Sequence, residues 1–467
     1  MKMWSGRFRE PLDPDFAAWQ RSFSFDRRLL RYELAASATH ARALEAVGVL
    51  SADELSDILG GLETIGRQAA ASSSFLDDTE AEDVHHFVES QLARLIGDAG
   101  LKLHAGRSRN EQIATSLRLY VRAAIDQILI DLAALCSAFV RRAESCEDAA
   151  MPSYTHLQRA EPVLVAHWLL AYVEMFLRDA ERLADCRKRL NCCPLGSGAV
   201  AGATLALDRE QMAHDLGFAC PAANSMDATS DRDFALEFAH SLSLLAIHLS
   251  RWAEEMILFS TEEYGFIHLP EQFSTGSSAM PQKKNPDLLE LVRGKCGRMI
   301  GNATSLAVTL KGLPLAYDKD VQETQEPVFD SAETMLQMLP LCARWMKSAD
   351  FRLDCMHAAA EAGFMNAWAA ATYLSKRGVP SRRAHEIIGK AVQICLSKPC
   401  QLRDIPFEEL RGLSPVFDTD FYESLHLASV LQIHDVPGGT APTQVRQALE
   451  DAKDRIAALR NDAPVPV

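Results

Sequence analysis

The sequence predicts an all-α protein: an elongated subunit built on a long central helical bundle. Apolar residues recur at three- and four-residue spacing along most of the chain, and the alternation typical of strands is almost absent. Four segments with this spacing run well beyond the average helix of about 11–12 residues. They cover residues 108–147, 162–190, 231–263 and 286–310. Long helices need long partners, so we expect them to pack side by side.

The chain order suggests three regions. Residues 1–106 read as an N-terminal helical domain, where Ser51 and Glu54 have the spacing of a capping box. Residues 107–355 form the predicted long-helix bundle domain, whose apolar faces are wider than one chain can cover and therefore indicate an oligomer. Residues 356–467 read as a C-terminal domain of shorter helices, punctuated by "SKRGVPSRR" and "HDVPGGTAPTQ".

Composition excludes several classes of protein. The chain has 48 Lys and Arg against 63 Asp and Glu, and a net charge of −15 disfavours a nucleic-acid partner. The N-terminus lacks an apolar signal segment, and the stretch "VLVAHWLLAYVEMFL" is interrupted by His167 and Glu174. We therefore expect no membrane span and a cytoplasmic protein. The eleven cysteines include no CxxC pair, so they indicate neither a disulfide framework nor a zinc site.

His85 and His86 stand beside Glu82 and Asp83 and could suggest a metal site. On a helix, Glu82 and His86 share one face, but two ligands do not make a site, and the same spacing gives an ordinary surface pair. We expect no metal.

Three polar segments interrupt the helical pattern. In "LHAGRSRNEQ", Arg107, Arg109 and Asn110 crowd the start of a long helix, where donors suit a bound carboxylate. The plainer alternative is a capped helix start with solvated arginines. In "MPSYTHLQRAEP", His156 lies in a connection between two long helices and could move a proton near neutral pH. A lone histidine is more often structural.

The third segment is "STGSSAMPQKKNPDLLE", from Ser274 to Glu290. Gly276 gives the backbone freedom before Ser277, and Asn285 followed by Pro286 fits a helix N-cap with proline in the first position. Such a loop can close over a ligand. A disordered polar loop is the plain alternative, and a phosphate-binding loop is disfavoured because the glycine and Ser/Thr of the Walker pattern are missing.

Together, the three segments resemble the signature regions of the fumarase/aspartase superfamily. The wording of "GSSAMPQKKNP", "HAGRSRN", "YTHLQRAEP", "PLGSGAVAG", "NSMDATSDRDF" and "GLPLAYDKD" resembles its argininosuccinate lyase family. The resemblance runs from "MWSGRF" to about Asp330, and the rest of the chain is similar only in length and helical character.

The resemblance implies β-elimination, in which argininosuccinate splits at a C–N bond into arginine and fumarate without a cofactor. Ser277 would be the base, Lys283 and Asn285 would hold the carboxylate where charge develops, and Thr155 and Ser278 would complete the grip. His156, oriented by Glu290, would manage the proton on the nitrogen side. Further substrate contacts implied by the resemblance are Ser22, Arg109, Asn110, Tyr317 and Gln322. It also implies a homotetramer in which three subunits build each active site.

The sequence departs from the family pattern near the expected substrate contacts. Asp318, Thr324 and Gln325 stand where the family has asparagine, aspartate and lysine, and Ala105 and Glu111 stand where threonine and aspartate are commoner. Exchanging a lysine for Gln325 removes a charge, and charge-assisted hydrogen bonds are about twice as strong as neutral ones.

These departures leave the amine half of the substrate open. A rival interpretation is a related lyase that releases fumarate from another N-substituted aspartate, of the ethylenediamine disuccinate type. Adenylosuccinate lyase fits the "PQKKNP" wording less well. A crystallin-like structural relative need not keep His156 and Ser277, and both are present.

Overall fold

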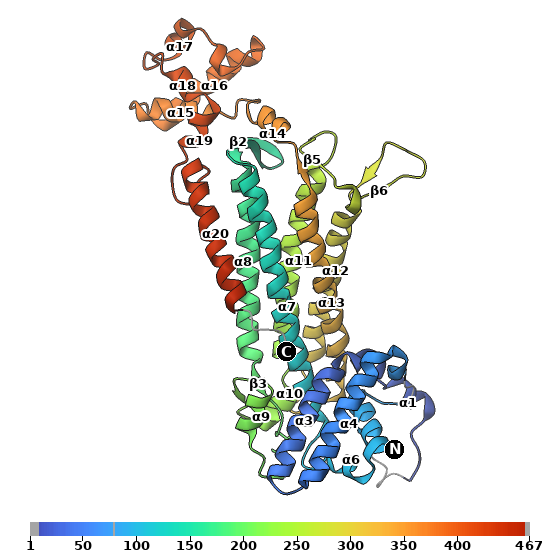
Figure 1. The fold of residues 1–467 in the computed structure, drawn as a ribbon. Helices are drawn as coiled ribbons and strands as arrows, with labels where there is room; N and C mark the ends of the chain where they lie inside the picture. Colours follow the sequence, from blue (N-terminus) through green and yellow to red (C-terminus); the bar gives the residue numbers. More distant parts are fainter. Residues whose placement is uncertain (1–8, 78–79, 463–467) are drawn as a thin grey trace.

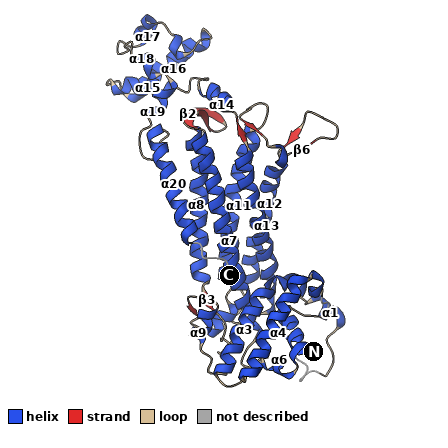
Figure 2. Cartoon of the chain, in the orientation of Figure 1, coloured by secondary structure: helices blue, strands red, loops and turns tan. Residues whose placement is uncertain are grey.

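The chain folds into an elongated, mainly helical molecule, as the sequence predicts (Figures 1 and 2). The computed structural model describes residues 9–77 and 80–462, so the "MWSGRF" segment lies outside the described residues. Long helices run side by side along the middle of the molecule, a group of shorter helices lies at one end, and a small helical lobe lies at the other.

The central bundle confirms the four expected long helices and adds a fifth. Its members are α7 (Arg109–Ser145), α8 (Val165–Leu190), α11 (Asp233–Phe259), α12 (Asp287–Leu310) and α13 (Gln325–Ser348). Sequence reasoning did not single out α13, which contains Pro340, a residue that usually ends or kinks a helix. Its apolar face is nevertheless buried against α7 and α11.

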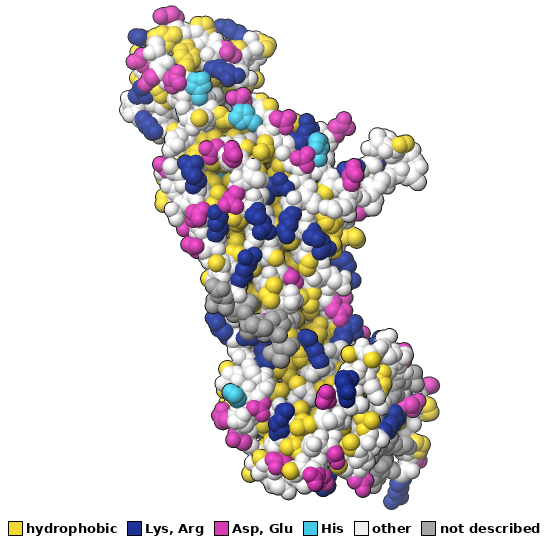
Figure 3. Space-filling view, viewed as in Figure 1, with side chains coloured by type: hydrophobic (Ala, Val, Ile, Leu, Met, Phe, Trp, Pro, Cys, Tyr) yellow, Lys and Arg dark blue, Asp and Glu magenta, His cyan; other side chains and the backbone are white. Residues whose placement is uncertain are grey.

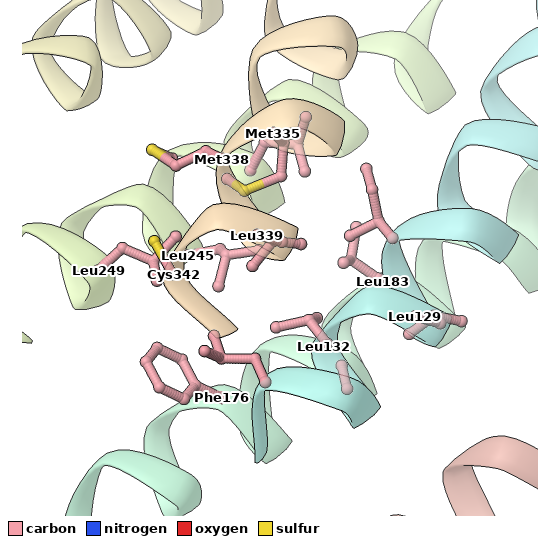
Figure 4. Packing of buried hydrophobic residues seen from close by; sticks show 14 of the residues in the cluster. Leu129, Leu132, Phe176, Leu183, Leu245, Leu249, Met335, Met338, Leu339 and Cys342 are labelled. Carbon is pink, nitrogen blue, oxygen red and sulfur yellow. The ribbon is translucent and has the colours of Figure 1, made fainter. Parts of the chain in front are cut away.

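Leucine, methionine and phenylalanine side chains from several bundle helices meet in the core. Leu132, Phe176, Leu245 and Leu339 come from four different helices and are fully buried (Figure 4). Burying a side chain of this size contributes about 1.5–3 kcal/mol. The shared apolar core therefore holds the helices side by side, and the length of the helices sets the distance between the two ends of the bundle.

By length and composition alone, α7 could cross a membrane. Of its most apolar window, 67% is buried inside the molecule. That burial is typical of the core helix of a bundle.

The N-terminal helices pack around the start of α7. They are α1 (Pro14–Trp19), α2 (Phe23–Asp26), α3 (Leu30–Ala46), α4 (Ala52–Ala71), α5 (Val84–Ile96) and α6 (Asp98–Lys102). Short 3₁₀ turns η1 (Arg27–Leu29) and η2 (Ser73–Leu76) connect them. The capping box at Ser51 and Glu54 is confirmed at the start of α4.

The C-terminal part divides into a lobe and a returning helix. After α14 (Leu353–Ala360), the lobe comprises α15 (Ala367–Lys376), α16 (Ser381–Ser397), η5 (Leu402–Asp404), α17 (Phe407–Leu413), α18 (Phe421–Ser424) and α19 (Leu427–Gln432). It has its own core, which includes Leu374, Ile388 and Phe421.

The last helix, α20 (Pro442–Asp462), leaves the lobe and packs against α7 and α8. It has 21 residues, fewer than any of the five bundle helices, in keeping with the shorter helices expected for this region. Val445, Ala452 and Ile456 belong to the same buried cluster as the bundle, and burial of this face explains why the helix packs there. The boundaries at 106 and 355 stay a prediction.

Short antiparallel or parallel strand pairs lie at the ends of bundle helices. The pairs are β1 (Ala150–Thr155) with β2 (Gln158–Leu164), β3 (Cys192–Cys193) with β4 (Cys220–Pro221), β5 (Ile267–His268) with β8 (Asp350–Phe351), and β6 (Thr275–Gly276) with β7 (Lys284–Asn285). The remaining elements are α9 (Arg209–Asp215), α10 (Ser225–Ser230), η3 (Glu271–Phe273) and η4 (Lys319–Thr324). These pairs shape the connections in which the polar segments lie.

Candidate active site

The candidate residues form two groups at opposite ends of the bundle. The lower group, beside the N-terminal helices, contains Ser22, Arg109, Asn110, Tyr317 and Gln322. The upper group, on the β1–β2 hairpin and the β6–β7 loop, contains Thr155, His156, Ser277, Ser278, Lys283, Asn285 and Glu290 (Figure 1). Helix α7 has 37 residues, which at 1.5 Å per residue spans about 55 Å. One chain cannot bring the two groups to one substrate.

Arg109 and Asn110 occupy the first turn of α7. Ser108 caps this helix in a capping box with Glu111, which confirms the capped helix start. The arginines are not solvated as the plainer alternative expected, because the side chains of Arg107 and Arg109 are only 3% and 16% exposed. Arg109 also pairs with Asp83, with 2.7 Å between Nη1 and Oδ1. The Asn110 side chain donates to the carbonyl of Ala199 over 3.3 Å. Both polar side chains are thereby held at a helix N-terminus, where the backbone favours an anion.

Ser22 lies buried next to a carboxyl group. Its hydroxyl donates to Asp26 over 2.6 Å, and the Val84 amide donates to the other carboxyl oxygen over 2.9 Å. Burial, reinforced by the nearby Asp83 carboxylate, raises the pKa of Asp26 to about 7. This contact fixes the Ser22 hydroxyl within the group.

Tyr317 and Gln322 follow α12 in sequence and lie at the same end of the bundle. Gln322 donates from its side chain to the Gln20 carbonyl over 3.2 Å. Burial raises the pKa of Tyr317, and the positive charges of Arg232 and Arg109 oppose that rise. Segments that are far apart in sequence therefore meet beside Arg109.

A buried carboxylate behind this group escaped sequence reasoning. Glu33 on α3 is 1% exposed and accepts hydrogen bonds from Ser37, Gln112 and Ser116. His85 Nδ1 lies 2.6 Å from its second oxygen. No motif marks Glu33, and it shares its helix face with the polar residues Ser37 and His40, so sequence reasoning had no clear signal for it. Its contacts anchor the first turns of α7.

In the upper group, His156 lies at the tip of the β1–β2 hairpin. Thr155 pairs with Gln158, leaving His156 and Leu157 as a two-residue turn. Both have a positive φ, 55° and 57°, as in the type I′ turns that suit the twist of antiparallel strands. Thr155, His156 and Leu157 are exposed. The hairpin therefore presents the histidine away from its own chain.

Ser277 lies in the loop between β6 and β7, which projects from the bundle (Figure 3). Its Oγ accepts the backbone N–H groups of Ala279 over 3.2 Å and of Met280 over 3.1 Å. Two N–H donors aimed at one oxygen stabilise negative charge on it. Ser278 and Lys283 are exposed in the same loop.

The base of the loop differs from the predicted cap. The α12 helix begins at Asp287 with Pro286 as its N-cap, so the expectation that Asn285 caps the helix is wrong. Asn285 instead pairs with Thr275 in the short β6–β7 ladder. The Asp287 carboxylate ties the start of α12 to β6, because the Thr275 hydroxyl donates to it over 2.6 Å. Glu290 is exposed in the first turn of α12.

Gln325, the residue that departs from the family lysine, begins α13. It is 2% exposed, and its neighbour Thr324 is fully buried. A lysine at this place would bring a charge into a buried environment, which is costly unless it is paired. The neutral amide avoids the cost of a buried charge, but its Oε1 is buried without a hydrogen-bond partner among the described residues.

The side chains near His85 that could suggest a metal site form hydrogen bonds within the fold instead. His85 faces Glu33, and the Asp83 carboxylate accepts the His86 backbone N–H over 2.7 Å as the N-cap of α5. Within residues 9–77 and 80–462, no three or more His, Cys, Asp or Glu side chains are grouped to hold a metal ion.

Comparisons with known proteins agree with the motifs. Residues 6–301 match a family described as "Lyase", and residues 364–432 match the family "Argininosuccinate lyase C-terminal". An argininosuccinate lyase of Koribacter versatilis is 60% identical over 98% of this chain and 98% of its own length. The chain belongs to the argininosuccinate lyase family. A second family member, from Acidobacterium capsulatum, is 58% identical over 99% of this chain and 96% of its own length.

Solved structures share the fold of this family member. An EDDS lyase variant with bound fumarate aligns with a TM-score of 0.83 and 23% identity over 97% of this chain and 92% of that chain. A class II fumarase from Schistosoma mansoni aligns with a TM-score of 0.74 and 16% identity, covering 85% and 90% of the two chains. The elongated all-α fold of this chain is therefore shared with these two solved structures.

Proposed function

We propose that this protein is an argininosuccinate lyase, which splits argininosuccinate into arginine and fumarate and so performs the last step of arginine biosynthesis. The observation that carries the proposal is 60% identity to a curated argininosuccinate lyase across nearly the whole length of both chains. The geometry of the Ser277 loop supports the same chemistry.

The elimination needs a base on a weakly acidic carbon. Removing the proton next to a carboxylate sends the electron pair onto that group, and the C–N bond then breaks to expel the arginine nitrogen. Ser277 is the proposed base, because its oxygen receives two backbone N–H groups that would stabilise an alkoxide. Lys283 and Asn285 are proposed to hold the doubly charged carboxylate, together with Thr155 and Ser278.

The other residues are assigned to the leaving nitrogen and to binding. His156, which the hairpin presents to solvent, is the proposed proton carrier on the nitrogen side, and Glu290 its charged partner. Ser22, Arg109, Asn110, Tyr317 and Gln322 are proposed to bind the substrate. We propose no metal or cofactor for this reaction.

A site divided between the two ends of one bundle supports a homotetramer with shared active sites. The outward face of α12 carries Gly294, Gly297 and Gly301, and a side chain at each would meet open space in this chain. Each glycine costs a helix interior about 1 kcal/mol relative to alanine. Exposed Leu291 on the same helix is 60% accessible. Small residues beside exposed apolar ones suit close packing by helices of other copies.

Absorbance of fumarate formed from argininosuccinate tests the function. Rapid release is the expected result. A folded protein that is inactive on argininosuccinate but releases fumarate from another N-substituted aspartate would show that the amine half of the substrate differs. We also propose that the enzyme acts in the cytoplasm, where its eleven free cysteines would stay reduced.

A further inference from the structure

Two cysteines face each other on the short parallel strands near the lower end of the bundle. Cys192 in β3 is the direct register partner of Cys220 in β4. Their sulfur atoms lie 3.5 Å apart. Cys220 is exposed and Cys192 is partly buried. Neither residue belongs to the proposed catalytic machinery.

The backbone spacing of this pair suits a disulfide. Adjacent strands lie about 4.8 Å apart, which falls within the Cα separation of roughly 4.4–6.8 Å found for disulfides. Strand alternation turns the next residue, Cys193, to the opposite side, where it is fully buried in a separate apolar cluster. Of these three thiols, only Cys192 and Cys220 can therefore meet without moving the backbone.

Two arginines of α7 hold the strand segments in place. Arg122 donates to the Asn191 side chain over 3.1 Å and to the Gly217 carbonyl over 2.7 Å. Arg118 donates to the Leu190 carbonyl over 2.9 Å. Backbone hydrogen bonds add to this, because the Ala219 amide donates to the Asn191 carbonyl over 3.0 Å. The thiol pair is thus presented by a well-anchored frame.

We propose that Cys192 and Cys220 are a peroxide-reactive thiol pair that closes into a reversible disulfide. The exposed Cys220 thiolate attacks hydrogen peroxide, the O–O bond breaks, and a sulfenic acid and hydroxide form. Cys192 sulfur then attacks the Cys220 sulfur and displaces its oxygen as water, so that two thiols and one peroxide give one disulfide and two waters. Cys192 takes the second step because it is less exposed to peroxide than Cys220.

The bond would lock a segment that contacts the candidate site. Between the two cysteines, the Gly198 amide donates to Glu111 over 3.1 Å, and the Ala199 carbonyl accepts from Asn110. Because the sulfurs already face each other, the disulfide keeps this arrangement. We therefore expect oxidation to protect the lower end of the bundle and to preserve turnover.

Peptide mass mapping after mild treatment of the full-length protein with hydrogen peroxide tests the proposal. The expected result is loss of two of the eleven titratable thiols, a cross-linked pair of peptides containing Cys192 and Cys220, and recovery of both thiols with dithiothreitol. The midpoint of thermal unfolding should rise by about 2–4 °C, with fumarate release within twofold of the reduced enzyme.

Three variants separate the outcomes. Cys192→Ser and Cys220→Ser should each abolish the cross-link and the thermal shift. Cys395 and Cys400 also lie close together, so Cys395→Ser is the control and should keep both the cross-link and the thermal shift. A cross-link that maps elsewhere, or peroxide that oxidises Cys220 only to sulfinic acid in the wild-type protein, would overturn the thiol pair. Activity lost in the wild type but retained in Cys192→Ser would overturn the protective role.

Discussion

The Oγ atom of Ser277 is the atom of the upper group that we propose takes the proton from the substrate. Backbone donors converge on it from two successive residues, and the exposed Lys283 lies in the same loop. These features stabilise negative charge, which both a deprotonated serine and a developing aci-carboxylate carry. Among the described residues, no such pair of backbone donors reaches the hydroxyl of the neighbouring Ser278, so the two serines make a matched comparison.

We expect Ser277→Ala to reduce fumarate release by about 10²–10⁴-fold, because a positioned acid or base contributes a factor of this size. The effect would be measured as the initial rate of fumarate formation from argininosuccinate, followed by absorbance, with the tetramer content of each sample checked. Ser278→Ala should lose less, since its proposed role is binding. Equal losses in the two variants would remove the case for Ser277 as the base.

Asp26 should make stability depend on pH. Its pKa is about 7 when folded against 3.8 for the ordinary side chain. Between these values the unfolded chain releases a proton that the folded chain keeps, so rising pH favours unfolding. The stabilising contribution is complete below pH 4 and is lost as the pH approaches 7.

We therefore expect Asp26→Asn to flatten the fall in unfolding midpoint between pH 5 and 7.5. The asparagine side chain can still accept a hydrogen bond from the Val84 backbone N–H and form one with the Ser22 hydroxyl, but it does not ionise. Thermal unfolding of both proteins across this range would measure the difference. Parallel curves would mean that Asp26 is ionised in the folded protein throughout.

At the scale of elements, the β1–β2 hairpin shows a local conflict between sequence and conformation. Leu157 adopts φ of 57° at a turn position that favours glycine, and its side chain is 68% exposed. A left-handed conformation costs a non-glycine residue about 1–2 kcal/mol. The fold of the hairpin overrides this cost and holds His156 at the tip.

Replacing Leu157 with glycine should relieve this strain. We expect Leu157→Gly to raise the free energy of unfolding by up to about 1 kcal/mol, as measured by denaturant titration. His156→Gly at the adjacent position should bring a similar gain in stability and a loss of fumarate release. If Leu157→Gly is destabilising, the leucine side chain makes a contact with another copy that outweighs the strain.

The glycines of α12 give a second test at this scale. Gly297→Leu should favour the isolated helix by about 0.8 kcal/mol, yet it should block close approach by a neighbouring copy. We expect smaller particles by light scattering and loss of activity. Gly60→Ala, on the exposed face of α4 with open space around it, should leave the assembly intact. An intact, active Gly297→Leu tetramer would place the interface on another face.

Periodicity predicted the fold better than it predicted element ends. The four expected long helices are present because their apolar spacing alone defines a buried face. Helix α13 was missed because Pro340 breaks the pattern, although surrounding helices tolerate it. The candidate residues came from motifs, while Glu33 depends on contacts with α5 and α7 that only the tertiary fold creates. Asn285 was misassigned as a cap because pairing with Thr275 outcompetes local capping.

For the whole molecule, the bundle acts as a spacer that keeps the two groups of candidate residues apart. Helix α7, which spans about 55 Å, separates the two groups within each chain. If sites form between copies, chains defective in different halves can supply each other's missing residues.

We expect mixed tetramers of Ser277→Ala and Arg109→Ala chains to recover activity that neither variant has alone. Unfolding and refolding the two proteins together, followed by fumarate assays, would measure the recovery. Refolding each variant separately gives the baseline. Absence of recovery in confirmed mixed tetramers would mean that each chain completes its own site.

The return of α20 to the bundle also bears on synthesis of the chain. Val445, Ala452 and Ile456 follow the C-terminal lobe in sequence but complete the core beside α7 and α8. During synthesis, the apolar surface of α7 and α8 that α20 covers therefore stays exposed until the whole lobe has emerged from the ribosome. The lobe has its own core and can fold during that interval. Until α20 arrives, the nascent bundle exposes apolar surface of the kind that chaperones cover.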